Sequence, residues 1–242
     1  YYFVDFYCIS CYFVIMPRNS RVVIEGCAHH VTQRGNNRQD VFFVDDDRRV
    51  FLDLLAEAAE RFNLAVDGYC LMTNHVHLVV TPDRQDSLAN ALKRTNQLYA
   101  QYVNRLHGRS GHLWQDRFFS CPLDETHRWR ALVYIERNPV RARLCRKVWR
   151  WPWSSASAHC GSDGWAGLLD LSGWQKQMDA ARWRDLLTRA DDEQHLSRLR
   201  LCTSRGRPLG SDKFVAKLET LIGRRLRPLP RGRPVKNRVR PY

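Results

Sequence analysis

Two histidines separated by one residue stand out as candidate metal ligands. His75 and His77 flank Val76 in an apolar, β-branched run at residues 75–81. Alternate residues of a β-strand point to the same face of the sheet, so both imidazoles would project together. This spacing suits chelation of one divalent ion, although two surface histidines would give the same pattern.

The residues around the two histidines exclude one enzyme class and disfavour one metal ion. Histidine-triad nucleotide hydrolases also carry alternating histidines, but the third position here is Val79. Zinc is disfavoured because no cysteine or further histidine stands at ligand spacing nearby. Two imidazoles with an amide oxygen and open positions for water and phosphate suit Mg²⁺ or Mn²⁺. We therefore expect Mg²⁺ or Mn²⁺ as the cofactor.

A tyrosine and an asparagine four residues apart form a second candidate group. Tyr134 and Asn138 would share one face of a helix. A tyrosine hydroxyl can attack a phosphodiester and form a 5′-phosphotyrosine ester, which keeps the energy needed to join a second strand. A phenol is scarcely ionised at neutral pH, so a metal ion would have to share the work. The alternative is a core tyrosine followed by an asparagine that caps the helix before Pro139.

These residues fall on a predicted β-α-β-β-α order. Strands are expected at residues 29–33, 66–72 and 75–81, the last two joined by a tight hairpin. Helical spacing of apolar residues predicts helices from residue 45 to 62 and from 87 to 106, and a third helix at 125–137. This order predicts the α+β class: a ferredoxin-like αβ plait, with an antiparallel sheet and helices on one face, plus a helical, basic C-terminal extension.

Four blocks of the sequence, in matching order, resemble one known family. Residues 69–79 resemble the histidine-bearing strand of IS200-like Y1 transposases of the HUH type, and most of all the REP-associated tyrosine transposases. Residues 29–38, 113–118 and 134–142 (followed by 153–155) agree as well. The resemblance implies a ferredoxin-like catalytic domain that cleaves and rejoins single-stranded DNA next to a hairpin.

The resemblance also implies roles for individual residues. It makes Tyr134 the nucleophile and arranges His75, His77 and Asn138 around the metal ion. IS200-like members often carry glutamine at the amide position, so the shorter Asn138 leaves open whether it binds the metal directly or through water. Two other functions remain open, a rolling-circle replication initiator or relaxase and a non-catalytic DNA-binding regulator on the same fold.

The charge of the chain points to a polyanionic partner. Lys and Arg number 39 against 25 Asp and Glu, a net charge of +14. Residues 201–242 hold 12 of the basic residues and 2 acidic ones, about +10 of this total. We expect single-stranded or hairpin DNA as the partner, although a solvated tail would have the same composition. The predicted DNA contacts are Arg34, Arg38, Trp114, Arg117, Arg205, Arg207, Arg231 and Arg233.

The basic tail contains one short motif twice. Arg-Gly-Arg-Pro occurs at residues 205–208 and 231–234. It resembles the core of an AT-hook, in which the backbone lies flat in a narrow minor groove. Arginine-rich tails also produce this tetrapeptide by chance.

We divide the chain into four parts. Residues 1–16 form an apolar extension before an expected natural start at Met16, and they are too short to span a bilayer. Residues 17–158 are the expected catalytic domain, 159–202 a helical segment, and 203–242 a DNA-binding tail. The eight scattered cysteines suggest reduced thiols and a cytoplasmic location. We expect no membrane partner. Monomer and homodimer are both compatible with the sequence.

Overall fold

The computed structural model describes residues 21–162 and 165–228. The expected extension at residues 1–16 and the predicted contacts of Arg231 and Arg233 lie outside these residues. No helix in the described ranges is long and apolar enough to cross a bilayer. The strands are β1 His29–Arg34, β2 Leu64–Leu71, β3 His75–Pro82 and β4 Phe119–Pro122. The helices are η1 Asn36–Arg38, α1 Asp45–Arg61, α2 Ser87–Leu106, α3 Glu125–Arg141, η2 Val148–Arg150, α4 Ala156–His159, η3 Ala166–Leu168, α5 Leu171–Gln175, α6 Ala180–Thr188, α7 Glu193–Arg205 and α8 Asp212–Ile222.

The four strands form one antiparallel sheet in the order β2-β3-β1-β4. β2 and β3 are joined by the predicted hairpin, where the Met72 N–H donates to the His75 carbonyl at 2.9 Å. β1 lies between β3 and β4, as the ferredoxin-like plait requires, and the α+β class is confirmed. β4, a strand of only four residues, was not predicted from the sequence.

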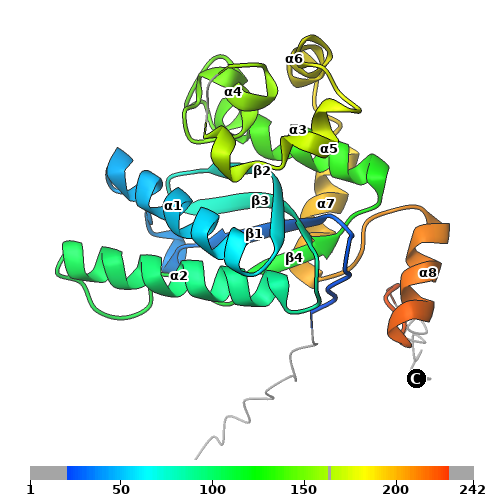
Figure 1. Cartoon of the computed structure of the whole chain (residues 1–242), viewed down its shortest axis with the longest axis horizontal. Coiled ribbons are helices and arrows are strands. Elements are labelled where there is room, and N and C mark those ends of the chain that lie inside the picture. The colour runs from blue at the N-terminus through cyan, green and yellow to red at the C-terminus, as the bar shows by residue number, and fades with distance from the viewer. Residues whose placement is uncertain (1–20, 163–164, 229–242) are drawn as a thin grey trace, which may run out of the picture.

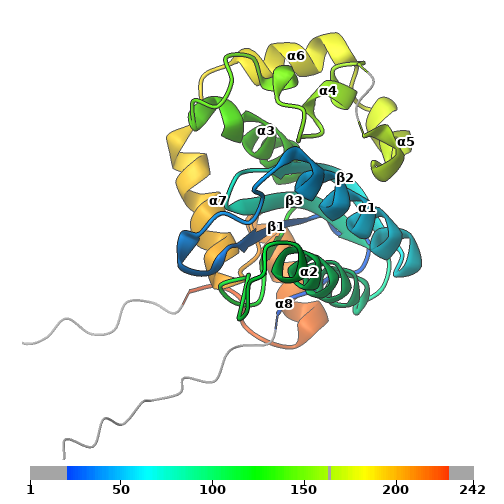
Figure 2. The ribbon, with the colours of Figure 1, turned by 90° about the vertical axis from the view of Figure 1, so that its left-hand side faces the viewer.

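Helices cover both faces of this sheet (Figures 1 and 2). α1 and α2 pack against the face that carries Val76, Leu78 and Val80. α3 packs against the opposite face, where Val79 of β3 and Leu132 of α3 belong to one core cluster. The sequence predicted helices on one face only. α1 and α2 fit this prediction, whereas α3 and α7 lie on the other face. The reason is that apolar side chains also lie on the second face of the sheet, where Cys70, Val79 and Cys121 belong to the core cluster of α3, so this face needs a cover too.

Helix α3 does not end at Asn138 and Pro139, as the sequence predicted. It continues to Arg141, and the Ala142 N–H donates to the Asn138 carbonyl at 2.9 Å. Pro139 removes one N–H donor, but the turn continues around it. Asn138 is thus an interior helical residue, which keeps its side chain on the face of Tyr134 rather than at a cap.

The C-terminal segments are packed onto the domain. α7 crosses the boundary expected between residues 202 and 203, so this boundary does not separate two structural units. α7 lies against β4 and β1, and α8 packs on Val22 and Ile24 through Leu218. The described part of the expected tail, residues 203–228, is therefore built into the fold.

The first Arg-Gly-Arg-Pro motif does not have the flat conformation of an AT-hook. Gly206 adopts a left-handed conformation (φ +62°) and caps the C-terminus of α7. The chain then pairs Leu209 with Leu123 in a parallel bridge. The AT-hook interpretation of residues 205–208 is therefore wrong, because the motif is a helix cap. The second copy, at residues 231–234, lies outside the described residues.

A buried carboxyl group ties α3 to the helices beyond it. Glu136 is fully buried, and its Oε1 accepts a hydrogen bond from Ser155 Oγ and lies beside His159 Nδ1, both at 2.5 Å. Its Oε2 accepts from Trp183 Nε1 at 2.8 Å. These contacts fix α3, and with it the neighbouring Tyr134, relative to α4 and α6.

Replacing Glu136 with alanine should lower the free energy of unfolding by about 3–5 kcal/mol, because several buried polar groups lose their partner together. Urea denaturation of wild type and Glu136→Ala measures this. The exposed Glu60 in α1 offers the control, and Glu60→Ala should change stability by less than about 0.5 kcal/mol. A loss below about 1 kcal/mol in Glu136→Ala would contradict the structural role given to this group.

Candidate active site

One cavity gathers most of the residues predicted to do chemistry. It has a volume of about 460 Å³ and lies where β1 and β3 face α3 and α7. Its lining residues are His30, Thr32, Arg34, His75, His77, Gln115, Phe119, Tyr134, Asn138, Arg200, Thr203 and Ser204. Five of the predicted site residues therefore meet here: Arg34, His75, His77, Tyr134 and Asn138.

Strand pairing places the two predicted metal ligands on one face. His77 of β3 pairs with Thr32 of β1, and His75 pairs with Arg34. Residues directly opposite each other in antiparallel strands point to the same face. The two imidazole centroids are 5.0 Å apart. Strand alternation has thus brought both rings to the wall of the cavity.

The ring nitrogens of both histidines are partly committed. His75 Nδ1 lies 2.6 Å from Asn74 Oδ1, and His77 Nδ1 lies 3.0 Å from His30 Nε2. The Nε2 atoms of His75 and His77 form no hydrogen bond with the described residues, and both side chains line the cavity. A histidine that binds a metal ion through one ring nitrogen usually donates the N–H of the other nitrogen to a neighbouring acceptor. Both histidines have their Nδ1 atoms placed for such a bond.

A chain of hydrogen bonds sets the tautomer of His77. Thr203 Oγ1 donates its single proton to the Leu199 carbonyl at 2.8 Å. The same oxygen must therefore accept from His30 Nδ1–H, 2.8 Å away. A neutral His30 then accepts at Nε2 from His77 Nδ1–H, which leaves a lone pair on His77 Nε2.

Burial keeps these histidines neutral. It lowers the pKa of His30 to about 3 and, together with the charge of Arg34, lowers the pKa of His75 to about 4. Burial also lowers the pKa of His77 well below its usual value, and the neighbouring His75 and His30 act in the same direction. The imidazoles can therefore bind a cation at neutral pH without first losing a proton.

Tyr134 reaches the same cavity from α3. Its side chain is 5 % exposed, and the rings of His30 and His77 lie edge-on at centroid distances of 5.6 and 5.5 Å. Arg200 Nε of α7 donates to the phenol oxygen at 3.4 Å, and the Arg141 guanidinium lies 4.6 Å from the ring centroid. Two cations thus lie beside a phenol, where they would stabilise negative charge that develops during a reaction.

Asn138 is held by Arg141. Its Oδ1 accepts a hydrogen bond from Arg141 Nη2 at 2.6 Å, and its buried Nδ2 finds no partner among the described residues. Arg141 also donates to the Tyr134 carbonyl and pairs with Asp191 at 3.1 Å. The amide oxygen keeps one free lone pair, but the adjacent guanidinium charge opposes a cation there. Contact between Asn138 and a metal ion through water fits this arrangement better than direct coordination.

The donor set fits a divalent ion with open positions. Across residues 21–162 and 165–228, no three His, Cys, Asp or Glu side chains cluster as metal ligands. An ion held by His75 and His77 would therefore take its remaining ligands from an amide, water or phosphate. Mg²⁺ and Mn²⁺ accept oxygen ligands of this kind.

The other predicted DNA contacts in the described residues lie outside the cavity. Arg38 is exposed in η1 and does not line the cavity. Trp114 packs against Phe51 and Tyr99, with its Nε1 donating to the Asn96 carbonyl at 3.0 Å. Its ring is thus largely engaged in the α1–α2 core. The remaining three, Arg117, Arg205 and Arg207, line a neighbouring pocket.

Three residues that contact the candidate catalytic groups, directly or through His30, were not predicted from the sequence: His30, Arg200 and Thr203. His30 lies within the block at residues 29–38 that carries the family resemblance, and its alternation with Thr32 and Arg34 could have placed it on the histidine face. Arg200 and Thr203 had no signal, because only tertiary packing brings α7 to the sheet.

Comparison with known proteins agrees with the fold. Residues 23–138 match the model of the family described as IS200-like transposase. A solved REP-associated tyrosine transposase bound to a REP hairpin is 18 % identical, with a TM-score of 0.52 over 60 % of this chain and 86 % of that chain. A proposed transposase from Deinococcus radiodurans R1 is 21 % identical, with a TM-score of 0.36 over 49 % of this chain and 95 % of that chain. No curated protein matches the chain.

These findings define an α+β domain of the ferredoxin-like type with a histidine and tyrosine cavity. Residues 23–138 belong to the IS200-like transposase family. The domain is therefore that of a transposase, a DNA-cleaving enzyme. Enzymes of this family generally depend on a divalent metal ion.

Proposed function

We propose that this chain is a metal-dependent single-strand DNA endonuclease and strand transferase that acts beside a DNA hairpin, with Tyr134 as nucleophile. The observation that carries the proposal is the meeting of Tyr134, His75 and His77 in one cavity. The solved transposase of similar fold is bound to a REP hairpin, which supports hairpin DNA as the substrate class.

The proposed reaction has two balanced steps. Tyr134 Oη attacks the scissile phosphorus, and the bond from phosphorus to the 3′ oxygen breaks. The phenol loses its proton, the departing 3′ oxygen gains one, and the DNA stays attached as a 5′-phosphotyrosine ester. The 3′-hydroxyl of a second strand then attacks this ester, which joins the strands and returns the phenol.

The residues around the phenol have separate tasks in this proposal. His75 and His77 would hold Mg²⁺ or Mn²⁺, which polarises the scissile phosphate when bound. Arg200 lies at the attacking oxygen, and Arg141 holds the Asn138 amide and pairs with Asp191 outside the helix. Arg34 brings a positive charge to the rim of the cavity.

The test of the proposal is incubation with single-stranded oligonucleotides that contain a hairpin with randomised flanks, in the presence of Mg²⁺. A covalent protein–DNA band that survives denaturing electrophoresis is expected. Non-covalent binding without this band would instead indicate a DNA-binding regulator on the same fold.

His30 acts in this account as a positioning residue for His77. His30→Phe keeps a ring of similar size but cannot accept from His77 Nδ1–H, so Mn²⁺ affinity should fall about 10–100-fold. His30→Gln offers an acceptor oxygen and should recover part of the loss. Isothermal titration of the folded proteins with Mn²⁺ measures this without any cleavage assay. Equal affinity of His30→Phe and wild type would show that the hydrogen bond is only structural.

A further inference from the structure

A second pocket, the arginine pocket, adjoins the catalytic cavity. It has a volume of about 610 Å³ and is walled by the segment at Arg21, residues 116–120, the end of α7 and the segment after α8. It shares Phe119, Thr203 and Ser204 with the catalytic cavity. The two cavities therefore lie side by side on the surface, within reach of one DNA strand.

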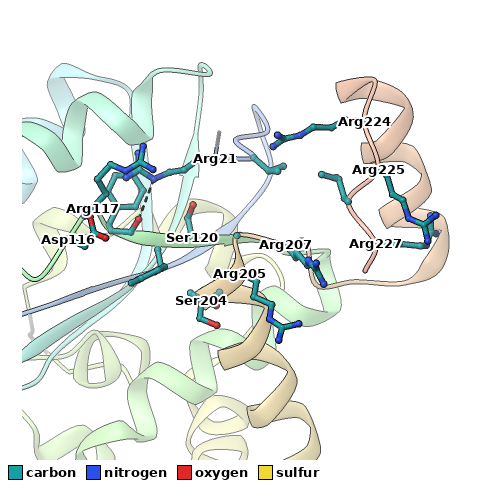
Figure 3. A pocket seen from close by; sticks show the side chains of 16 residues that line it. Arg21, Asp116, Arg117, Ser120, Ser204, Arg205, Arg207, Arg224, Arg225 and Arg227 are labelled. Atoms are coloured by element: carbon teal, nitrogen blue, oxygen red, sulfur yellow. Dashed lines mark hydrogen bonds between the residues drawn. The ribbon is translucent and has the colours of Figure 1, made fainter. Parts of the chain in front are cut away.

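The lining of this pocket is strongly positive. Seven of its lining residues are arginines, and Asp116 is the single acidic one. The arginines are Arg21, Arg117, Arg205, Arg207, Arg224, Arg225 and Arg227. Figure 3 shows Arg21 and Arg117 on one side, Arg224 on the α8 side, and Arg205 and Arg207 between them. Residues far apart in sequence thus converge on one positively charged hollow.

Internal contacts satisfy only some of these arginines. Arg227 pairs with Glu219, and Arg225 donates to the Pro228 carbonyl at 3.1 Å. The side chains of Arg117, Arg205 and Arg207, in contrast, form no hydrogen bond or ion pair with the residues that the structure describes. These three guanidinium groups are available for an external anion.

At Arg21, the positive charge of the neighbouring Arg117 outweighs the negative charge of Asp116. Arg21 stacks over Phe118 at 3.7 Å and donates to its carbonyl at 3.3 Å. Burial lowers the pKa of Arg21, and the positive charge of Arg117 lowers it further, more than Asp116 raises it. A bound polyanion would relieve this repulsion between like charges.

We propose that the arginine pocket binds the sugar–phosphate backbone of the single DNA strand that leads away from the scissile phosphate. This inference rests on the proposed function of the catalytic cavity. Among the arginines of the pocket, Arg117 alone lies within residues 23–138, which match the transposase family. The segments outside this match therefore supply most of the groups that would bind DNA.

The size and walls of the pocket favour a single strand. Its volume lies in the range of pockets that enclose small ligands. A duplex, whose major groove alone is about 12 Å wide, is too thick to enter such a pocket. Phe119 is 43 % exposed at the wall shared by the two cavities. An unpaired base could stack on this ring while its phosphates face the arginines.

The test is equilibrium binding of a labelled thirty-nucleotide oligo-dT strand against salt concentration, measured by fluorescence anisotropy. All proteins carry Tyr134→Phe, so that no strand is cut. The test variant is Arg205→Gln with Arg207→Gln. Each phosphate contact on a single strand contributes about 0.7 to the slope of log affinity against log salt, so the slope should fall by about 1.4.

A matched control removes the same charge elsewhere. Arg182 and Arg189 are exposed on and just after α6, on the far side of the molecule from α8 (Figure 2). Arg182→Gln with Arg189→Gln should leave the slope unchanged, and thermal melting checks that both variants are folded. An unchanged slope in the test variant, or an equal fall in the control, would overturn the assignment.

A second probe distinguishes single strand from duplex. On a blunt hairpin without single-stranded flanks, the test variant should bind nearly as tightly as its parent. An equal loss on this hairpin would show that the pocket holds the stem, which contradicts the proposal.

The outcomes also separate this inference from the proposed function. Covalent adducts from the protein with intact Tyr134, combined with an unchanged slope, would reject only the pocket. A reduced slope without any adduct would reject the nuclease proposal and leave a DNA-binding pocket.

Discussion

Replacing Tyr134 with phenylalanine is expected to reduce formation of the covalent DNA adduct by about 1,000-fold or more, because only the attacking oxygen is lost. The ring would keep its place between the histidines and Arg141. Among the residues that the structure describes, the lost hydroxyl has one hydrogen bond, a long one from Arg200. Stability and DNA affinity should therefore change little. Denaturing electrophoresis of labelled hairpin DNA measures the adduct, and anisotropy measures the affinity.

Tyr102→Phe is the matched control for this variant. Tyr102 lies in α2, on the opposite face of the sheet from the candidate site, and its hydroxyl donates to Asp47 Oδ1 at 3.1 Å. Its loss should leave adduct formation intact. If adducts persist in Tyr134→Phe at the wild-type rate, another tyrosine is the nucleophile and the proposed mechanism fails.

Replacing His77 with alanine is expected to have the next largest effect, a loss of cleavage of about 100-fold or more. His77 offers its Nε2 lone pair to the cavity, and its Nδ1–H is held by His30. The variant should also lose measurable Mn²⁺ binding, while DNA affinity should persist because the arginines remain. His75→Ala should behave in the same way, since both imidazoles reach one wall.

An exposed histidine provides the comparison. His112 lies in the loop before Trp114, away from the catalytic cavity, and His112→Ala should cleave like wild type. Excess EDTA should abolish cleavage by the wild-type protein, and added Mg²⁺ or Mn²⁺ should restore it. Full cleavage in EDTA would contradict the role given to the two histidines.

The central part of the fold and site could be predicted because it follows from local periodicity. The alternation of apolar residues and histidines in β3 determines which side chains share a face. The four-residue spacing of Tyr134 and Asn138 does the same for α3. The hairpin between β2 and β3 has a two-residue turn, which sequence patterns indicate well.

Other parts depend on contacts between distant segments. β4 has only four residues, too few for a clear alternating pattern. Pro139 is normally a helix terminator, yet the packing of α3 carries the helix past it. No local pattern could show that Thr203 reaches His30, because 173 residues separate them in the chain.

The basic C-terminus shows how composition can mislead. Its charge suggested a separate tail, but α8 buries Leu218 against Val22 near the start of the domain. Gly206 then assumes a capping role that the motif alone does not reveal. The charge itself was informative, since Arg205 and Arg207 line a positive pocket beside the site.

The most direct test of the account is to identify the residue that carries the DNA. The covalent adduct, formed with hairpin DNA and Mg²⁺, is digested with nuclease and trypsin and analysed by mass spectrometry. Trypsin cuts after Arg130 and Arg137, so Tyr134 lies in the peptide of residues 131–137. We expect a nucleotide remnant on this peptide, linked through a 5′-phosphate to Tyr134. A remnant on any other peptide, or the absence of a covalent adduct with every hairpin in the pool, would contradict it.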